Sequence, residues 1–199
     1  METVTVNFNS IIHLTDNQFY QLCQENPEVK FERNAKGELL IMPPTGGETG
    51  NQNAEISADF VIWNRQTLLG KVFDSSTCFK LPNGANRSPD VAWVKNERWD
   101  SLSLEEKAKF PPIAPDFVLE LMSPTDSLKV AQDKMQEYQE NGVRLGWLIN
   151  SKTRRVEIYR VEQTVEVLQS PGMISGEDVL PGFVLNLQIF WSSERKSVN

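Results

Sequence analysis

The segment Phe117–Met122 constrains the fold of this chain most strongly, because five of its six residues are apolar and only Glu120 carries a charge. A continuous apolar run of this length is typical of a central strand that is covered on both faces of a sheet. A helix is expected next, from about residue 126 to 140 with Gly142 as its C-terminal signal, and Leu145–Ile149 follows as a second apolar strand. This order of elements predicts an α/β fold.

Further elements are predicted on both sides of this unit. Thr15 and Ser103 each precede a Gln or Glu by three residues, and this capping-box pattern predicts helices over about 16–25 and from 104 to before Pro111. Apolar residues at helical spacing predict a long amphipathic helix over 51–69 with its buried stripe centred on Ala58. The first predicted strands form a hairpin around 35–37, and the next form an antiparallel meander over 71–74, 77–81 and 90–94. Towards the C-terminus, 155–161 and 165–169 are predicted to form a second hairpin, and one last strand is expected within 177–191. The expected architecture is a central mixed sheet flanked by helices, with a C-terminal β-hairpin extension.

The whole chain, residues 1–199, is predicted to form one domain with its core over about 10–190, because no linker-like composition divides it. The net charge of −7 and the pI of about 4.9 argue against a broad basic surface for nucleic acid. The N-terminus lacks a signal-like pattern and no apolar run reaches the ~18 residues of a membrane span, so a cytoplasmic location without membrane contact is expected. With His13 as the sole histidine and two separated cysteines, neither a zinc site nor a Ser-His-Asp hydrolase is supported.

Two carboxylates lie where the surrounding pattern predicts buried strands. Asp90 directly precedes the apolar segment Val91–Val94, and Glu120 lies in mid-strand between two leucines. An unpaired buried carboxylate is costly or changes its pKa, so two on neighbouring strands are expected to share a cation. Asp116 competes with Asp90 because it also follows a proline, but it lies at the entry of its strand, where a solvated carboxylate costs little.

Helix geometry predicts that a lysine and a third carboxylate border the same region. At 100° per residue, Lys134 lies about 60° from an apolar face centred near Ala131 and Met135. Glu55 lies about 60° from the stripe centred on Ala58 by the same arithmetic. Both have an ordinary alternative, because helix glutamates are often solvated and lysines beside apolar faces often extend into solvent.

Such a set of side chains has the chemistry that phosphodiester hydrolysis requires. Magnesium favours a few carboxylates plus waters, and a nearby lysine can orient or deprotonate the attacking water and balance developing charge. Lys80 is the rival lysine if its side chain faces inward. A glycosidase with paired carboxylates is not favoured, because the five tryptophans lie mostly inside apolar patterns rather than in an exposed sugar cleft.

Asp90, followed after 29 residues by Glu120-Leu121-Met122, resembles the signature of PD-(D/E)xK nucleases, the restriction-endonuclease-like superfamily. Met122 stands at the position of the signature's lysine, whereas Lys134 suits branches in which that lysine is displaced to the neighbouring helix. Longer segments across about residues 10–190 resemble the Uma-type putative restriction endonuclease family: Pro43–Gly46, Arg87–Asp90, Pro115–Pro124, Asp133–Tyr138 and Gly146–Ile149.

The resemblance implies a restriction-endonuclease-like core and an endonuclease that hydrolyses DNA with Mg²⁺, or with Mn²⁺ as the alternative ion. By position, Asp90 and Glu120 would hold the metal, Glu55 would assist directly or through a water, and Lys134 would position the nucleophilic water.

Arg87, Gln132 and Lys80 are further candidates for contacts with the substrate. The resemblance also implies a homodimer. One alternative stays open, a catalytically inactive nuclease-fold module that binds nucleic acid or protein, which Met122 and the net charge of −7 favour.

Overall fold

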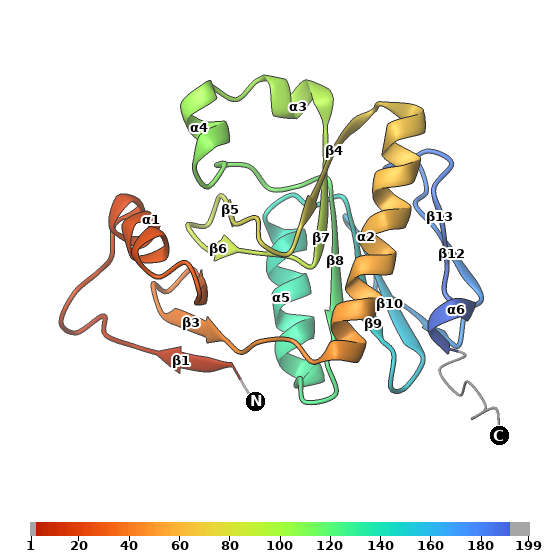
Figure 1. Ribbon diagram of the computed structural model, residues 1–199, viewed down its shortest axis with the longest axis horizontal. Helices are drawn as coiled ribbons and strands as arrows, with labels where there is room; N and C mark the ends of the chain where they lie inside the picture. Colours follow the sequence, from red (N-terminus) through yellow and green to blue (C-terminus); the bar gives the residue numbers. More distant parts are fainter. Residues whose placement is uncertain (1–2, 192–199) are drawn as a thin grey trace.

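A computed structural model describes residues 3–191 of the protein and shows two sheets side by side with helices packed around them (Figure 1). In the large sheet only β8 and β9 run parallel to each other, so the predicted mixed sheet is confirmed. Its strands, in spatial order, are β11 (Glu166–Gln169), β10 (Arg155–Arg160), β9 (Leu145–Asn150), β8 (Phe117–Met122), β7 (Val91–Lys95) and β4 (Gly70–Asp74).

The small sheet is antiparallel and contains the N-terminal strands. Its spatial order is β1 (Val4–Val6), β3 (Leu39–Met42), β2 (Lys30–Arg33), β6 (Asn86–Arg87) and β5 (Phe79–Lys80). Helix α1 (Asp16–Glu25) packs beside it, and its predicted capping box is present, with Thr15 and Gln18 bonded reciprocally. A C-terminal hairpin of β12 (Met173–Ser175) and β13 (Val184–Asn186) is followed by α6 (Gln188–Trp191) and confirms the predicted extension.

Helices cover both faces of the large sheet, as the apolar character of β8 predicts. On one face lies α2 (Gly47–Thr67) with the C-terminal hairpin, and on the other lies α5 (Leu128–Glu140) (Figure 1). The short helices α3 (Asn96–Asp100) and α4 (Leu104–Ala108) follow β7, and α4 begins with the predicted capping box at Ser103. Within residues 3–191 no helix is both long and apolar enough to cross a membrane.

Strand β8 places alternate side chains in two different cores. Phe117, Leu119 and Leu121 join the cluster under α2, whereas Val118 and Met122 join the cluster under α5. Glu120 therefore faces α5, because successive side chains of a strand point to opposite faces. Helix α5 lies close to the sheet, since a Cβ added at Gly146 would come within 2.6 Å of Cε of Met135.

The predicted meander over 71–94 is wrong in its middle strand. β4 pairs directly with β7, and the two-residue strand β5 instead pairs with β6 in the small sheet. A turn at Gly84, with φ of 88°, returns the chain to β6, where Asn86 pairs with Arg33 of β2. The segment 88–90 then links β6 to β7, so it carries Asp90 to the junction of the two sheets.

The predicted buried stripe of α2 is also wrong. Ala58 is exposed, and the buried face contains Ile56, Phe60 and Trp63 instead. At 100° per residue the exposed Ala58 lies about 160° from the centre of that face. The larger side chains were buried in preference because they remove more apolar area from water.

Candidate active site

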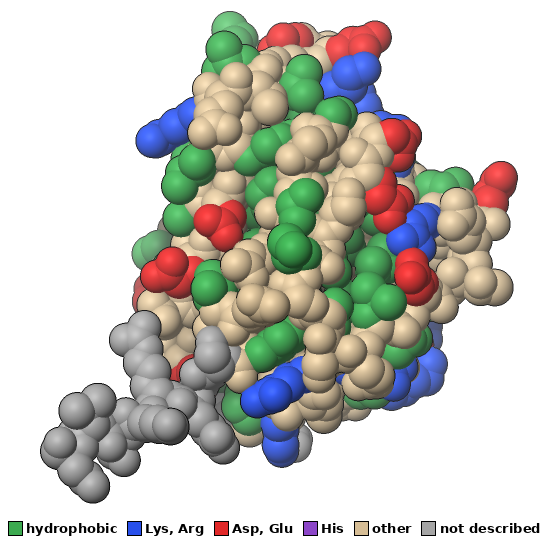
Figure 2. Space-filling view, turned by 90° about the vertical axis from the view of Figure 1, so that its right-hand side faces the viewer, with side chains coloured by type: hydrophobic (Ala, Val, Ile, Leu, Met, Phe, Trp, Pro, Cys, Tyr) green, Lys and Arg blue, Asp and Glu red, His purple; other side chains and the backbone are tan. Residues whose placement is uncertain are grey.

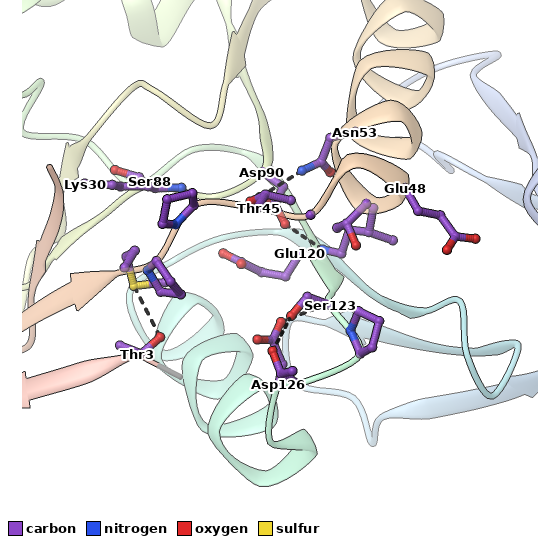
Figure 3. Close-up of a pocket in the computed structure, with 18 of the residues that line it drawn as sticks. Thr3, Lys30, Thr45, Glu48, Asn53, Ser88, Asp90, Glu120, Ser123 and Asp126 are labelled. Carbon is purple, nitrogen blue, oxygen red and sulfur yellow. Dashed lines mark hydrogen bonds between the residues drawn. The ribbon is translucent and has the colours of Figure 1, made fainter. Parts of the chain in front are cut away.

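A pocket of about 490 Å³ opens at the junction of the two sheets (Figure 3). Its wall combines β2, the turn before α2 with the first turn of α2, and the loop after β8. Three of the predicted site residues, Asp90, Glu120 and Lys134, line this one pocket. They come from the link between β6 and β7, from β8 and from α5, and the fold brings them together.

Asp90 is positioned by the pairing of β7 with β8. Val91 pairs with Leu119, so the same register extended by one residue sets Asp90 opposite Glu120. Directly opposed residues of an antiparallel pair have Cβ atoms ~4.5–5.5 Å apart. The main-chain N–H of Leu121 donates to Oδ2 of Asp90 at 2.8 Å and fixes this carboxylate at the pocket. Burial raises the pKa of Asp90, although the Leu121 N–H and the charge of Lys30 oppose the shift.

Glu120 projects from β8 towards α5, and its side chain is 14% exposed. Oε1 of Glu120 accepts a hydrogen bond from the Tyr138 hydroxyl at 2.9 Å and pairs with Nζ of Lys134 at 2.8 Å. Burial, together with the negative charges of Asp90 and Glu32, outweighs Lys134 and raises the pKa of Glu120 to about 7. A carboxyl group with this pKa exchanges its proton near neutral pH.

Lys134 points back from α5 to the sheet, as its place beside the apolar face predicts. Met135 and Tyr138 on that face are buried, which confirms the helix orientation. Nζ of Lys134 lies between two carboxylates, 2.8 Å from Oε1 of Glu120 and 2.9 Å from Oε1 of Glu32. Burial alone would lower the pKa of Lys134, but these two charges raise it overall. Lys134 is therefore a fixed positive charge at neutral pH.

Glu32 is a central residue of the site that the sequence pattern did not reveal. It is 1% exposed and accepts hydrogen bonds from Lys134, from Nη1 of Arg87 at 3.0 Å and from the Ser88 N–H at 3.0 Å. Burial would raise its pKa, but Lys134 and Arg87 lower the pKa of Glu32 to about 2. No local signal marks Glu32, because its partners are far away in the sequence; Lys134 is 102 residues on.

The structure does not bring Glu55 to the pocket. Glu55 is exposed on α2, about 100° from the centre of the buried face by helix geometry. Together with burial, its charge raises the pKa of the neighbouring Asp59 of the same helix. Asn53, which borders the buried face of α2, lines the pocket instead of Glu55. Its Nδ2 lies 3.4 Å from Oδ1 of Asp90.

The other candidate residues lie outside the pocket lining. Arg87 is buried and binds Glu32 and Glu137, so it supports the site from behind. Lys80 pairs with Asp16 on α1, which removes it as the rival lysine.

Gln132 donates to both carboxylate oxygens of Glu157, at 2.9 and 3.1 Å, on the face of α5 turned towards β10. Asp116 is 1% exposed rather than solvated, and it accepts from the Lys95 N–H at 2.9 Å and pairs with Arg98 at 3.0 Å. Asp116 therefore links the end of β7 to α3 through these two contacts and does not belong to the site.

Among residues 3–191 no group of three or more His, Cys, Asp or Glu side chains is arranged to hold a metal ion. The two carboxylates Asp90 and Glu120 remain. The charge of Asp90 raises the pKa of Glu120, and the charge of Glu32 raises the pKa of both groups. One or two carboxylates, completed by waters and substrate oxygens, is the usual protein contribution to a Mg²⁺ site. The donor set therefore fits magnesium and does not fit a metal that needs a full set of protein ligands.

The fold of this chain, on which the pocket is built, is similar to that of a protein of known structure. A crystal structure described as a putative nuclease belonging to DUF820 from Anabaena variabilis superimposes with a TM-score of 0.70 at 20% sequence identity. The match covers 83% of this chain and 91% of that one and shows the likeness of the fold.

The family model of the Uma2 proteins, described as putative restriction endonucleases, matches residues 16–188. The chain belongs to this family. No curated protein matches it in sequence.

Proposed function

We propose that this protein is a metal-dependent nuclease that hydrolyses phosphodiester bonds of DNA in the pocket between the two sheets. One observation carries the proposal: Asp90 and Glu120 face the same pocket, and Lys134 reaches Glu120 there at 2.8 Å. Membership of a family described as putative restriction endonucleases supports the same interpretation of the site.

Asp90 and Glu120 would hold the magnesium ion, and Asn53 would steady the Asp90 carboxylate. When bound, the ion supplies Lewis-acid polarisation of a phosphoryl oxygen and makes a coordinated water more acidic. A divalent cation favours the ionised form of Glu120 and so opposes burial and the charges of Asp90 and Glu32, which raise the pKa of Glu120 to about 7.

Lys134 acts as an electrostatic group rather than as a base. Its raised pKa keeps the ammonium protonated, so it cannot accept a proton from water at neutral pH. Its contacts with Glu120 and Glu32 fix the carboxylate of Glu120 beside the metal position and hold the acidic groups of the site together. Met122, at the usual lysine position, lies 7% exposed in the apolar core under α5 and takes no part.

The second candidate is a nuclease-fold module without catalysis. It is favoured by the same double ion pair, because Lys134 is already neutralised by two glutamates in the resting protein. The two functions differ in one respect, since only the enzyme turns over a substrate when Mg²⁺ is added.

Cleavage of supercoiled plasmid and of linear single-stranded DNA, with Mg²⁺, Mn²⁺ or EDTA, tests the proposal. Asp90→Asn and Glu120→Gln should each lower the rate at least a hundredfold, since metal polarisation of the phosphate contributes roughly several kcal/mol. Glu55→Gln is the matched control, because it makes the same change on the exposed face of α2 and should cleave like wild type. Equal nicking by wild type and all three variants would show that the activity does not come from Asp90 and Glu120. Binding of DNA without cleavage would favour the second candidate, the nuclease-fold module without catalysis.

We also expect a homodimer. Apolar side chains interrupt the polar surface on the face formed by α2 and the C-terminal hairpin (Figure 2). The exposed apolar residues of these elements include Ile62 on α2, Met173 on β12 and Val184 on β13, which are 54%, 66% and 52% exposed. Light scattering of the purified protein gives its mass directly, and a monomer at all concentrations would contradict this expectation.

A further inference from the structure

The pocket carries more negative than positive charge, which is unusual for a site that receives a phosphodiester chain. Its charged lining residues are four acids and two lysines: Glu48, Asp90, Glu120, Asp126, Lys30 and Lys134. One divalent cation offsets two of these negative charges. A substrate phosphate therefore needs a protein cation that is not already neutralised.

Lys134 does not meet this need. It is bound to Glu120 and Glu32 at the same time, at 2.8 and 2.9 Å, and its side chain is 14% exposed. Its charge is committed to holding the site together.

Lys30 differs from Lys134 in its surroundings. None of the ion pairs found within residues 3–191 includes Lys30, although its charge acts on Asp90 and lowers the pKa of that carboxyl group against the effect of burial. Lys30 is half-buried at the pocket wall. A lysine in such a place commonly covers its stem and keeps its ammonium in water.

The pairing of β2 explains why Lys30 faces the pocket. Lys30 and Glu32 are two residues apart on one strand and so point to the same side, and Glu32 contacts Lys134 beneath the pocket. β2 is fixed by its ladder with β3, in which Lys30 pairs with Met42, itself a lining residue. In Figure 3, Lys30 lies on the side of the pocket opposite Glu48, with Asp90 and Glu120 between them.

We propose that Lys30 binds a phosphate of the substrate chain on the β2 side of Asp90 and thereby positions the bond to be cleaved. This role rests on the proposed nuclease function. The chain enters from the side of β2, because the opposite side carries Glu48 and the loop after β8 carries Asp126. Since an ammonium is a point charge that recognises a phosphate rather than a base, the contact is independent of sequence.

Binding of fluorescently labelled DNA and RNA oligonucleotides of one sequence, measured by anisotropy in Ca²⁺ at several salt concentrations, tests this role. Lys30→Gln should weaken binding roughly tenfold and reduce the slope of log affinity against log salt by about one, as expected for the loss of one phosphate contact. Lys30→Arg should keep the slope. Lys71→Gln, on the exposed edge strand β4, is the matched control and should keep both affinity and slope.

Cleavage kinetics in Mg²⁺ provide the second readout. Lys30→Gln should raise KM with a smaller effect on kcat, because a ground-state phosphate contact is lost. An unchanged salt slope and KM in Lys30→Gln, with a wild type that binds and cleaves, would overturn the role of Lys30 and leave the nuclease function intact. A wild type that binds neither oligonucleotide would overturn both.

Discussion

The raised pKa of Glu120 makes the stability of the protein depend on pH in a way that one substitution removes. The shift from the ordinary value of 4.5 to about 7 corresponds to about 3 kcal/mol, at ~1.4 kcal/mol per unit. The folded protein holds this proton more tightly than the unfolded chain does. The contribution of Glu120 to stability is therefore complete below pH 4.5 and is lost as the pH rises through about 7.

The substitution Glu120→Gln keeps the shape of the side chain and removes the titration. Lys134 still has Glu32 as its partner at 2.9 Å, so the ammonium is not left unpaired. Relative to wild type, Glu120→Gln should gain about 2.5 kcal/mol in free energy of unfolding between pH 5 and pH 8, since the first part of the titration lies below pH 5. Other titrating groups are common to both proteins and cancel in this difference.

Urea unfolding followed by circular dichroism at pH 5, 6, 7 and 8 measures the difference. Glu55→Gln is the control and should follow wild type at every pH, since Glu55 is exposed. Magnesium should stabilise wild type more at pH 8 than at pH 5 and leave Glu120→Gln unchanged, because the ion binds the ionised pair. A difference between wild type and Glu120→Gln that stays constant over this range would refute the reasoning.

Substitutions at three further positions test other parts of the structure. Asp116→Ala should lower the free energy of unfolding by roughly 3 kcal/mol, since it leaves Arg98 and a buried N–H without their partner, yet cleavage by the folded variant should persist in a plasmid assay. Gly70→Ala should lower the melting temperature strongly, because its Cβ would lie 2.4 Å from the main-chain oxygen of Val94, and a normal melting temperature would contradict this packing. Lys134→Met should abolish cleavage while Lys134→Arg retains part of it; equal activity of the two variants would rule out an electrostatic role for Lys134.

Local patterns in the sequence predicted the framework of the site. The apolar strand around Glu120, the capping boxes at Thr15 and Ser103 and the apolar face beside Lys134 all have the predicted structure. These features follow from the strand period of two and the helix period of 3.6, which neighbouring residues set by themselves. Asp90 and Glu120 share a pocket, and their roles as metal ligands stay a prediction.

The prediction that Glu55 borders the site is wrong, because it assumed the wrong buried face for α2. Ala58, Val61 and Ile62 suggested one stripe, whereas Ile56, Phe60 and Trp63 form the buried face of α2. Both stripes satisfy helical spacing, so periodicity alone does not choose between them, and the greater area buried by the aromatic side chains decides.

The sequence by itself determined the α/β class, the order of most elements, and the two carboxylates and the lysine that reach the pocket. Only the tertiary structure assigned β5 and β6 to a second sheet and placed Glu32 and Lys30 at the site. The physical reason is distance along the chain. Lys134 and Glu32 are 102 residues apart, and a contact of that separation leaves no periodic trace in the sequence around either residue.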